Sequence, residues 1–238
     1  MRVVTLLVGQ VVGLLVAIVV GLPRLVTGIV ALAGRQGTDR VLRLRVVVQR
    51  DEAGAPVADL SDAQEAVAWA QECFRTQAGI RVVPVGWQRG DPLDVPADDP
   101  RFCAAADAPA GPPTLDVTCT TRAWRADLAA AGVGFRHAIR GQGGRTLPAY
   151  GAPVWAFAVR GFGTRHLGCS LGPLTDYVTV RFSGEPTTLA HELGHACGLW
   201  HTGANTLMHP KPSRTNALAA WQVWLVRASR HTTRGPAR

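Results

Sequence analysis

The sequence predicts an α+β fold, from the order of its strand-like and helix-like segments. Runs rich in Val, Leu, Ile and aromatic residues predict strands over 41–49, 80–85, 154–159 and 177–182. Apolar residues recur at helical spacing after Ser61 and again after Ser213, and each of these stretches predicts a helix. At 238 residues, the chain is long enough for one globular domain with a hydrophobic core.

The first predicted helix has a start signal and a stop signal. Ser61 can cap its start, and Gln64 three residues later completes a capping box. The helical spacing stops near Gly79. Between this helix and the later strands, the composition predicts a long loop, a short strand, a short helix and a glycine-rich connection, over 89–113, 115–119, 125–131 and 132–150.

The N-terminal segment is strongly apolar, since residues 3–22 carry no charge. A helix of about 20 residues extends about 30 Å, which matches the hydrocarbon thickness of a bilayer. Two predictions stay open for residues 1–35. The length of the run favours an N-terminal hydrophobic helix that anchors the chain in a membrane, and the alternative is a signal segment cut after Ala33. The remainder, 36–238, is predicted to be one domain.

The charge of the chain is basic, with 25 Lys and Arg against 17 Asp and Glu. Nearly all of the basic residues are arginines, and Lys211 is the only lysine. The arginines are scattered and rarely alternate with aromatic residues, so the pattern indicates a basic surface and no nucleic-acid partner.

The motif over 191–201 carries most of the chemistry. His191 and His195 are four residues apart, so a helix places both rings on one face, where they can reach one ion. Gly198 can adopt the left-handed conformation that ends a helix, which lets the chain turn back and bring His201 to the same ion. Glu192 is close enough to take a proton from a metal-bound water.

Three nitrogen ligands with one open position are typical of a catalytic zinc site, because structural sites are closed by four ligands. The nitrogen donors favour zinc over calcium and magnesium, although residue type alone does not separate zinc from other first-row metals. A second cofactor, calcium, has weaker support. A solvated acidic loop is the more common interpretation of its candidate ligands, Asp91, Asp94, Asp98 and Asp99.

The string H-E-x-x-H-x-x-G-x-x-H resembles the metzincin superfamily of zinc peptidases. Met208, seven residues past His201, resembles the methionine of the turn that metzincins carry beneath the zinc, and the Leu-Met-x-Pro form is most similar to the matrixin branch. Matrixins usually have Tyr after this Met, whereas this chain has His209, so no tyrosine role is carried over. His209 could instead line the pocket or compete for the metal.

The resemblance implies a metzincin-like catalytic domain, in which a twisted mixed sheet lies over the active-site helix and a C-terminal helix follows. It implies that the segment 154–159 is the edge strand that binds an extended peptide by strand addition, with a central strand as the alternative. It also implies a zinc-dependent endopeptidase that acts on a protein or peptide substrate with Glu192 as general base. A non-peptidase zinc amidohydrolase and a membrane-tethered zinc-binding interaction module remain as alternatives.

The cysteines and the resemblance together predict a domain outside the cytoplasm, on a single-pass anchor or secreted after signal cleavage. The arginines that follow the apolar run conflict with this orientation under the positive-inside rule. For an oxidising compartment, we expect disulfides between Cys169 and Cys197 and between Cys103 and Cys119. Free buried thiols are the alternative.

Overall fold

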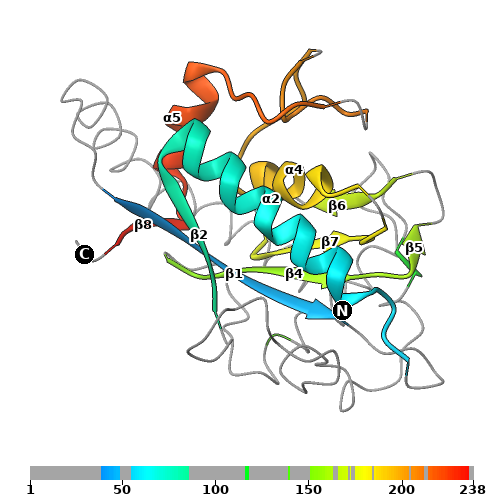
Figure 1. Cartoon of the computed structure of the whole chain (residues 1–238). Coiled ribbons are helices and arrows are strands. Elements are labelled where there is room, and N and C mark those ends of the chain that lie inside the picture. Colours follow the sequence, from blue (N-terminus) through cyan, green and yellow to red (C-terminus); the bar gives the residue numbers. More distant parts are fainter. Residues whose placement is uncertain are drawn as a thin grey trace, which may run out of the picture.

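The computed structural model describes residues 39–48, 55–85, 116–117, 139, 151–162, 166–170, 172, 175–183, 185–203, 205–211 and 214–235. These residues form an α+β fold with a mixed sheet, as the sequence predicts (Figure 1). The predicted apolar helix within 1–35 and the candidate calcium ligands lie outside them. Among the described helices, none has both the length and the apolar character needed to cross a bilayer.

The sheet has the strand order β2-β1-β4-β7-β6, and β8 also pairs with β1. The first four of these strands are parallel to one another, and they span Ile80–Pro84, Arg40–Val48, Val154–Ala158 and Tyr177–Val180. The edge strand β6 (Gly168–Ser170) and β8 (Thr232–Arg234) run antiparallel to their partners β7 and β1. A separate parallel pair is formed by β3 (Asp116–Val117) and β5 (Gly161–Phe162).

Strand β4 is central, and the expectation that 154–159 forms the sheet edge is wrong. β4 pairs with β1 on one side and with β7 on the other. All five of its residues are buried, because Val-Trp-Ala-Phe-Ala places apolar side chains on both faces. The edge is β6, beyond β7.

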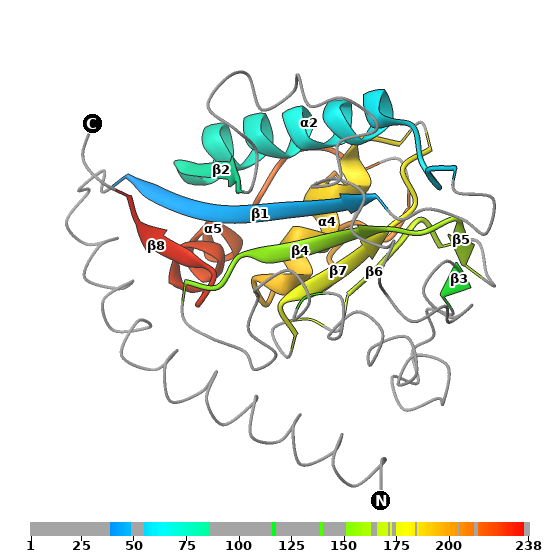
Figure 2. The same ribbon diagram turned by 90° about the horizontal axis from the view of Figure 1, so that it is seen from below.

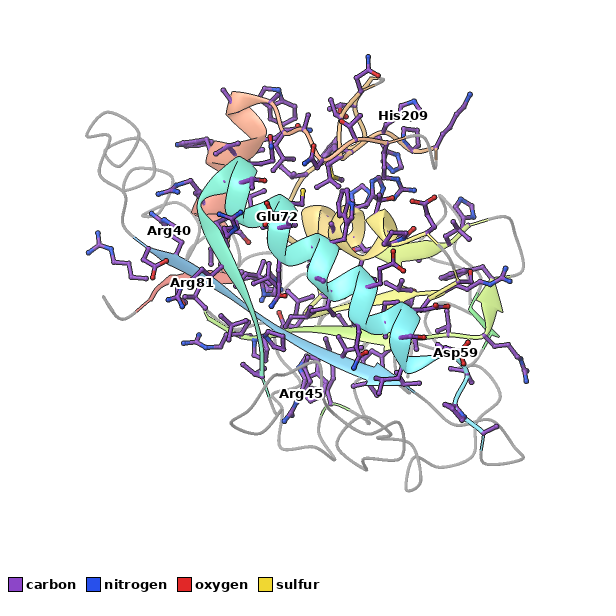
Figure 3. All side chains as sticks on the ribbon, viewed as in Figure 1. Arg40, Arg45, Asp59, Glu72, Arg81 and His209 are labelled. Atoms are coloured by element: carbon purple, nitrogen blue, oxygen red, sulfur yellow. The ribbon has the colours of Figure 1, made fainter. Side chains whose placement is uncertain are left out.

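Two buried clusters lie on opposite faces of the sheet, because successive strand residues point to opposite sides. In β4, Val154, Ala156 and Ala158 belong to the larger cluster. This cluster also contains buried residues of the helices over Leu60–Ala78 and Thr187–Ala196. Trp155 and Phe157 belong to the smaller cluster. There, the guanidinium carbon of Arg45, labelled in Figure 3, lies 4.7 Å from the centroid of the Trp155 ring.

Helix α2 (Leu60–Ala78) packs across one face of the sheet, on the same side as α4 (Thr187–Ala196) (Figures 1 and 2). Gly79 ends α2 in the left-handed conformation, at φ 61°, and this confirms the stop near Gly79. The start differs from the predicted cap. The N-cap is Asp59, and Ser61 lies inside the first turn, because Leu60 already has helical geometry and packs against the core.

The last helix, α5 (Ala220–Ala228), packs against α2, and the chain then enters β8. A buried ion pair between Arg230 and Asp176 fastens this segment to the sheet. Arg230 also donates from Nη2 to the carbonyl oxygen of Thr175 at 3.0 Å. Because both charged groups are buried, removing either one would leave an uncompensated charge in the interior.

The predicted disulfide between Cys169 and Cys197 is wrong. Cys197 is a free thiol, and burial raises its pKa to about 11. It immediately follows α4 and packs in the larger cluster, where it acts as a small apolar side chain. Cys169 is disulfide-bonded, and its partner lies outside the described residues. The predicted pair of Cys103 and Cys119 also lies outside the described residues.

Candidate metal centre

Helix α4 carries His191 and His195 one turn apart, as the motif predicts. The helix ends immediately afterwards, and Gly198 has φ 90°, a conformation that L residues with a side chain rarely adopt. A methyl group at Gly198 would contact nothing within 4 Å, so the backbone angle and not crowding requires glycine there. The turn brings His201 back toward the two helical rings.

The three imidazoles converge through one nitrogen each. The Nε2 atom of His195 lies 3.1 Å from Nε2 of His191 and 3.1 Å from Nε2 of His201. Among the described residues, these three form a group whose candidate ligand atoms all lie within 4.8 Å of one another. Tetrahedral zinc with Zn–N distances of about 2.0–2.1 Å places its nitrogen ligands about 3.3 Å apart, so the observed spacing fits.

The opposite ring nitrogens fix the tautomers of the two helical histidines. His191 Nδ1 lies 2.8 Å from the carbonyl oxygen of Leu207, and His195 Nδ1 lies 2.8 Å from that of Leu199. A carbonyl oxygen only accepts, so each Nδ1 carries the proton and donates it. In the neutral rings both Nε2 atoms therefore present lone pairs, and the lone pairs face each other. Lone pairs that face each other repel, so a cation between the rings would stabilise this arrangement.

A proton is a poor candidate for that cation near neutral pH. The pKa of His191 is lowered to about 3, mainly by burial and also by the charges of Arg214, His195 and His201. The hydrogen bond to Leu207 acts in the opposite direction and raises this pKa. Burial likewise lowers the pKa of His195 to about 4. Both rings are then neutral at pH 7, which is the form that binds metal.

Glu192 lies beside the histidines as a buried carboxylate, with a side chain whose Oε2 atom has no hydrogen-bond partner among the described residues. Burial raises the pKa of Glu192 to about 8, and the positive charge of Arg214 opposes the rise. A carboxyl group with a pKa near neutrality is suited to accept a proton and return it. The Oε2 atom thus keeps its capacity to accept a proton, since no described residue donates to it.

Gly168 of the edge strand packs directly against this carboxylate. A methyl group on Gly168 would lie 2.5 Å from Oε1 of Glu192 and 2.7 Å from its Cγ. The glycine therefore allows β6 and the Glu192 side chain to approach each other, which brings the sheet edge to the candidate centre.

Replacing Gly168 with Ala is expected to displace the Glu192 carboxylate and to reduce turnover of a peptide substrate by at least about tenfold, since a misplaced catalytic group can cost about 100-fold. The bound zinc per chain should stay at the parent value, because the three histidines are untouched. Steady-state kinetics with metal analysis checks both. Unchanged turnover would show that the contact has no part in placing Glu192.

Met208 packs against α4 at Gly194. Its side chain is fully buried, and a methyl group on Gly194 would come within 2.5 Å of its sulfur. The glycine between the two helical histidines thus lets the turn approach the helix. The preceding residue, Leu207, accepts the hydrogen bond from His191, so the turn also orients a candidate ligand.

Replacing Gly194 with Ala is expected to destabilise the fold by about 1–3 kcal/mol, because overpacking forces backbone or side-chain shifts. Chemical denaturation of the zinc-free protein measures this change. Shortening Met208 in the double variant Gly194→Ala, Met208→Ala should recover part of the loss. If the double variant is no more stable than expected from adding the two single effects, the two positions are not coupled.

His209 does not belong to the ligand group. Figure 3 shows it on the connection between α4 and α5, and the candidate ligand group among the described residues consists of His191, His195 and His201. Its Nδ1 is buried without a hydrogen-bond partner among the described residues. The geometry therefore gives no support to His209 as a competing ligand.

No protein-family model matches this chain, and no curated protein has a significantly similar sequence.

Proposed function

We propose that this protein is a zinc-dependent endopeptidase of the metzincin type, with a matrixin-like methionine turn. One observation carries the proposal. The Nε2 atoms of three imidazoles converge, and a buried carboxylate whose Oε2 has no hydrogen-bond partner among the described residues lies next to them. The antiparallel edge strand beside the helix and the methionine beneath it add support.

His191, His195 and His201 would hold the ion, and their neutral rings leave its charge uncompensated. Zinc in such a site supplies Lewis acidity, which polarises a carbonyl and lowers the pKa of water. Glu192 accepts the proton of the attacking water and then delivers it to the leaving nitrogen. Its raised pKa suits both steps, because the group is neither a strong acid nor permanently protonated near neutral pH.

The edge strand β6 is the proposed docking position for the substrate backbone. Among the described strands it pairs with β7 alone, and we propose that a peptide adds to its other edge. Gly168 lies on this strand and borders Glu192, so a peptide paired with β6 passes next to the carboxylate. We therefore propose β6, and not 154–159, as the strand that pairs with the peptide.

The test is cleavage of a quenched-fluorescent peptide library by the purified protein. Activity should disappear when a chelator removes the metal and should return when one equivalent of zinc is added back. Chelator-resistant cleavage would exclude the proposal. Stoichiometric zinc without any cleavage of peptides would instead favour a zinc-binding interaction module, and cleavage only of non-peptide amides would favour an amidohydrolase.

A further inference from the structure

Arg214 contributes a positive charge to the candidate centre from outside the motif. It lies on the connection between Met208 and α5. Its charge acts on all four residues of the centre, namely His191, His195, His201 and Glu192. The proposed mechanism gives this arginine no role.

The guanidinium of Arg214 is only partly satisfied. Its Nε donates to the carbonyl oxygen of Lys211 at 3.3 Å, which fixes the side chain on its own loop. Its Nη1 is buried and has no hydrogen-bond partner among the described residues. A buried donor without an acceptor is costly, and the cost is larger for a charged group.

The nearby carboxylates do not explain this donor. Glu192 and Glu185 act on Arg214 through their charges, but neither accepts a hydrogen bond from Nη1. Nη1 is therefore left without an acceptor, and because it is covered, an entering acceptor reaches it only when the groups that cover it shift.

We propose that Arg214 binds a carboxylate of the substrate, so that the enzyme prefers peptides with Asp or Glu close to the bond it cleaves. This inference rests on the proposed endopeptidase function. A carboxylate is favoured over a neutral acceptor because the planar guanidinium matches its two oxygens and because charge-assisted hydrogen bonds are the stronger ones. The chain's excess of basic residues acts in the same direction.

The test compares matched peptides that differ only by Glu against Gln at one position, scanned over the residues that flank the cleaved bond. The parent protein should cleave the best Glu peptide at least about tenfold more efficiently, as kcat/KM, than its Gln partner. Arg214→Gln should bring this ratio close to one. Arg214→Lys keeps the charge without the planar fork and should give an intermediate ratio, which also guards against a Gln variant that does not fold.

Arg75→Gln is the matched control, because it removes one positive charge from an exposed arginine on α2 that pairs with Glu72. It should leave the ratio at the parent value. A loss of preference in this control would assign the effect to net charge and overturn the role of Arg214. An equal loss of activity on the Glu and Gln peptides in Arg214→Gln would also overturn it, since Arg214 would then act on a group common to all peptides.

A binding measurement separates this inference from the proposed function. With Glu192→Gln, fluorescence anisotropy of labelled peptides should show about tenfold or greater preference for Glu over Gln, and this preference should vanish when Arg214→Gln is added. If the parent cleaves both peptides equally and no binding preference appears, the inference fails while the peptidase proposal stands. If the parent cleaves neither, the peptidase proposal fails, and the binding ratio still decides the role of Arg214.

Discussion

Replacing Glu192 with Gln is expected to lower kcat for peptide cleavage by about 10²–10⁴-fold, the usual contribution of general acid–base catalysis. Gln has nearly the same shape as Glu, so it fills the same buried space beside Gly168. It cannot accept the proton of the attacking water. Because the histidines are unchanged, the variant should retain zinc at the parent stoichiometry, and steady-state kinetics with metal analysis measures both quantities.

The same variant should not lose stability. Glu192 is buried, and its Oε2 has no partner among the described residues, so ionising it inside the protein is unfavourable. A neutral amide removes that cost, and the melting temperature of the metal-free variant should equal or exceed that of the parent at pH 9, above the raised pKa of about 8. A variant that turns over at the parent rate would remove Glu192 from the mechanism.

Replacing His195 with Ala is expected to have the largest effect on metal binding. Both of the 3.1 Å contacts between Nε2 atoms involve His195, so its removal takes away the ring that contacts both other candidate ligands. The loss of zinc affinity should exceed the roughly 10- to 100-fold that removal of an outer-shell partner costs. Competition with a zinc-binding dye measures the affinity, and peptide cleavage should be lost in parallel.

His209→Ala is the matched control for this experiment. It removes an imidazole from the same part of the structure, and this imidazole does not belong to the candidate ligand group. Its zinc affinity should stay within about twofold of the parent. If His209→Ala loses zinc and His195→Ala keeps it, the ligand set is wrong.

Local patterns predicted the parts of the centre that depend on local backbone geometry. The spacing of His191 and His195 requires only one helical turn, and the left-handed conformation of Gly198 is a property of glycine itself. Gly79 ends α2 in the same way, because it also adopts the left-handed conformation. Each of these features is decided within about one turn of the chain, where sequence spacing and spatial distance are closely related.

Features that depend on tertiary packing were not predictable in this way. The strand β6 is Gly-Cys-Ser, which has no apolar alternation, and its position follows from pairing with β7. The contact of Gly168 with Glu192 and the approach of Arg214 to the centre join segments distant in sequence. The central position of 154–159 is an exception that the sequence does indicate, because the strand has no polar residue to face solvent.

The pairing of β1 has a consequence for how the chain is made. One edge of β1 pairs with β2 soon after in the chain, whereas the other edge is shared by β4 and β8. Residues Arg40–Leu42 of this edge bond to Thr232–Arg234, almost the whole length of the chain away. At about 5–20 residues per second, a ribosome takes on the order of ten seconds or more between these strands. During that interval this part of β1 lacks its β8 partner, and an unpaired strand edge is prone to pair with other chains.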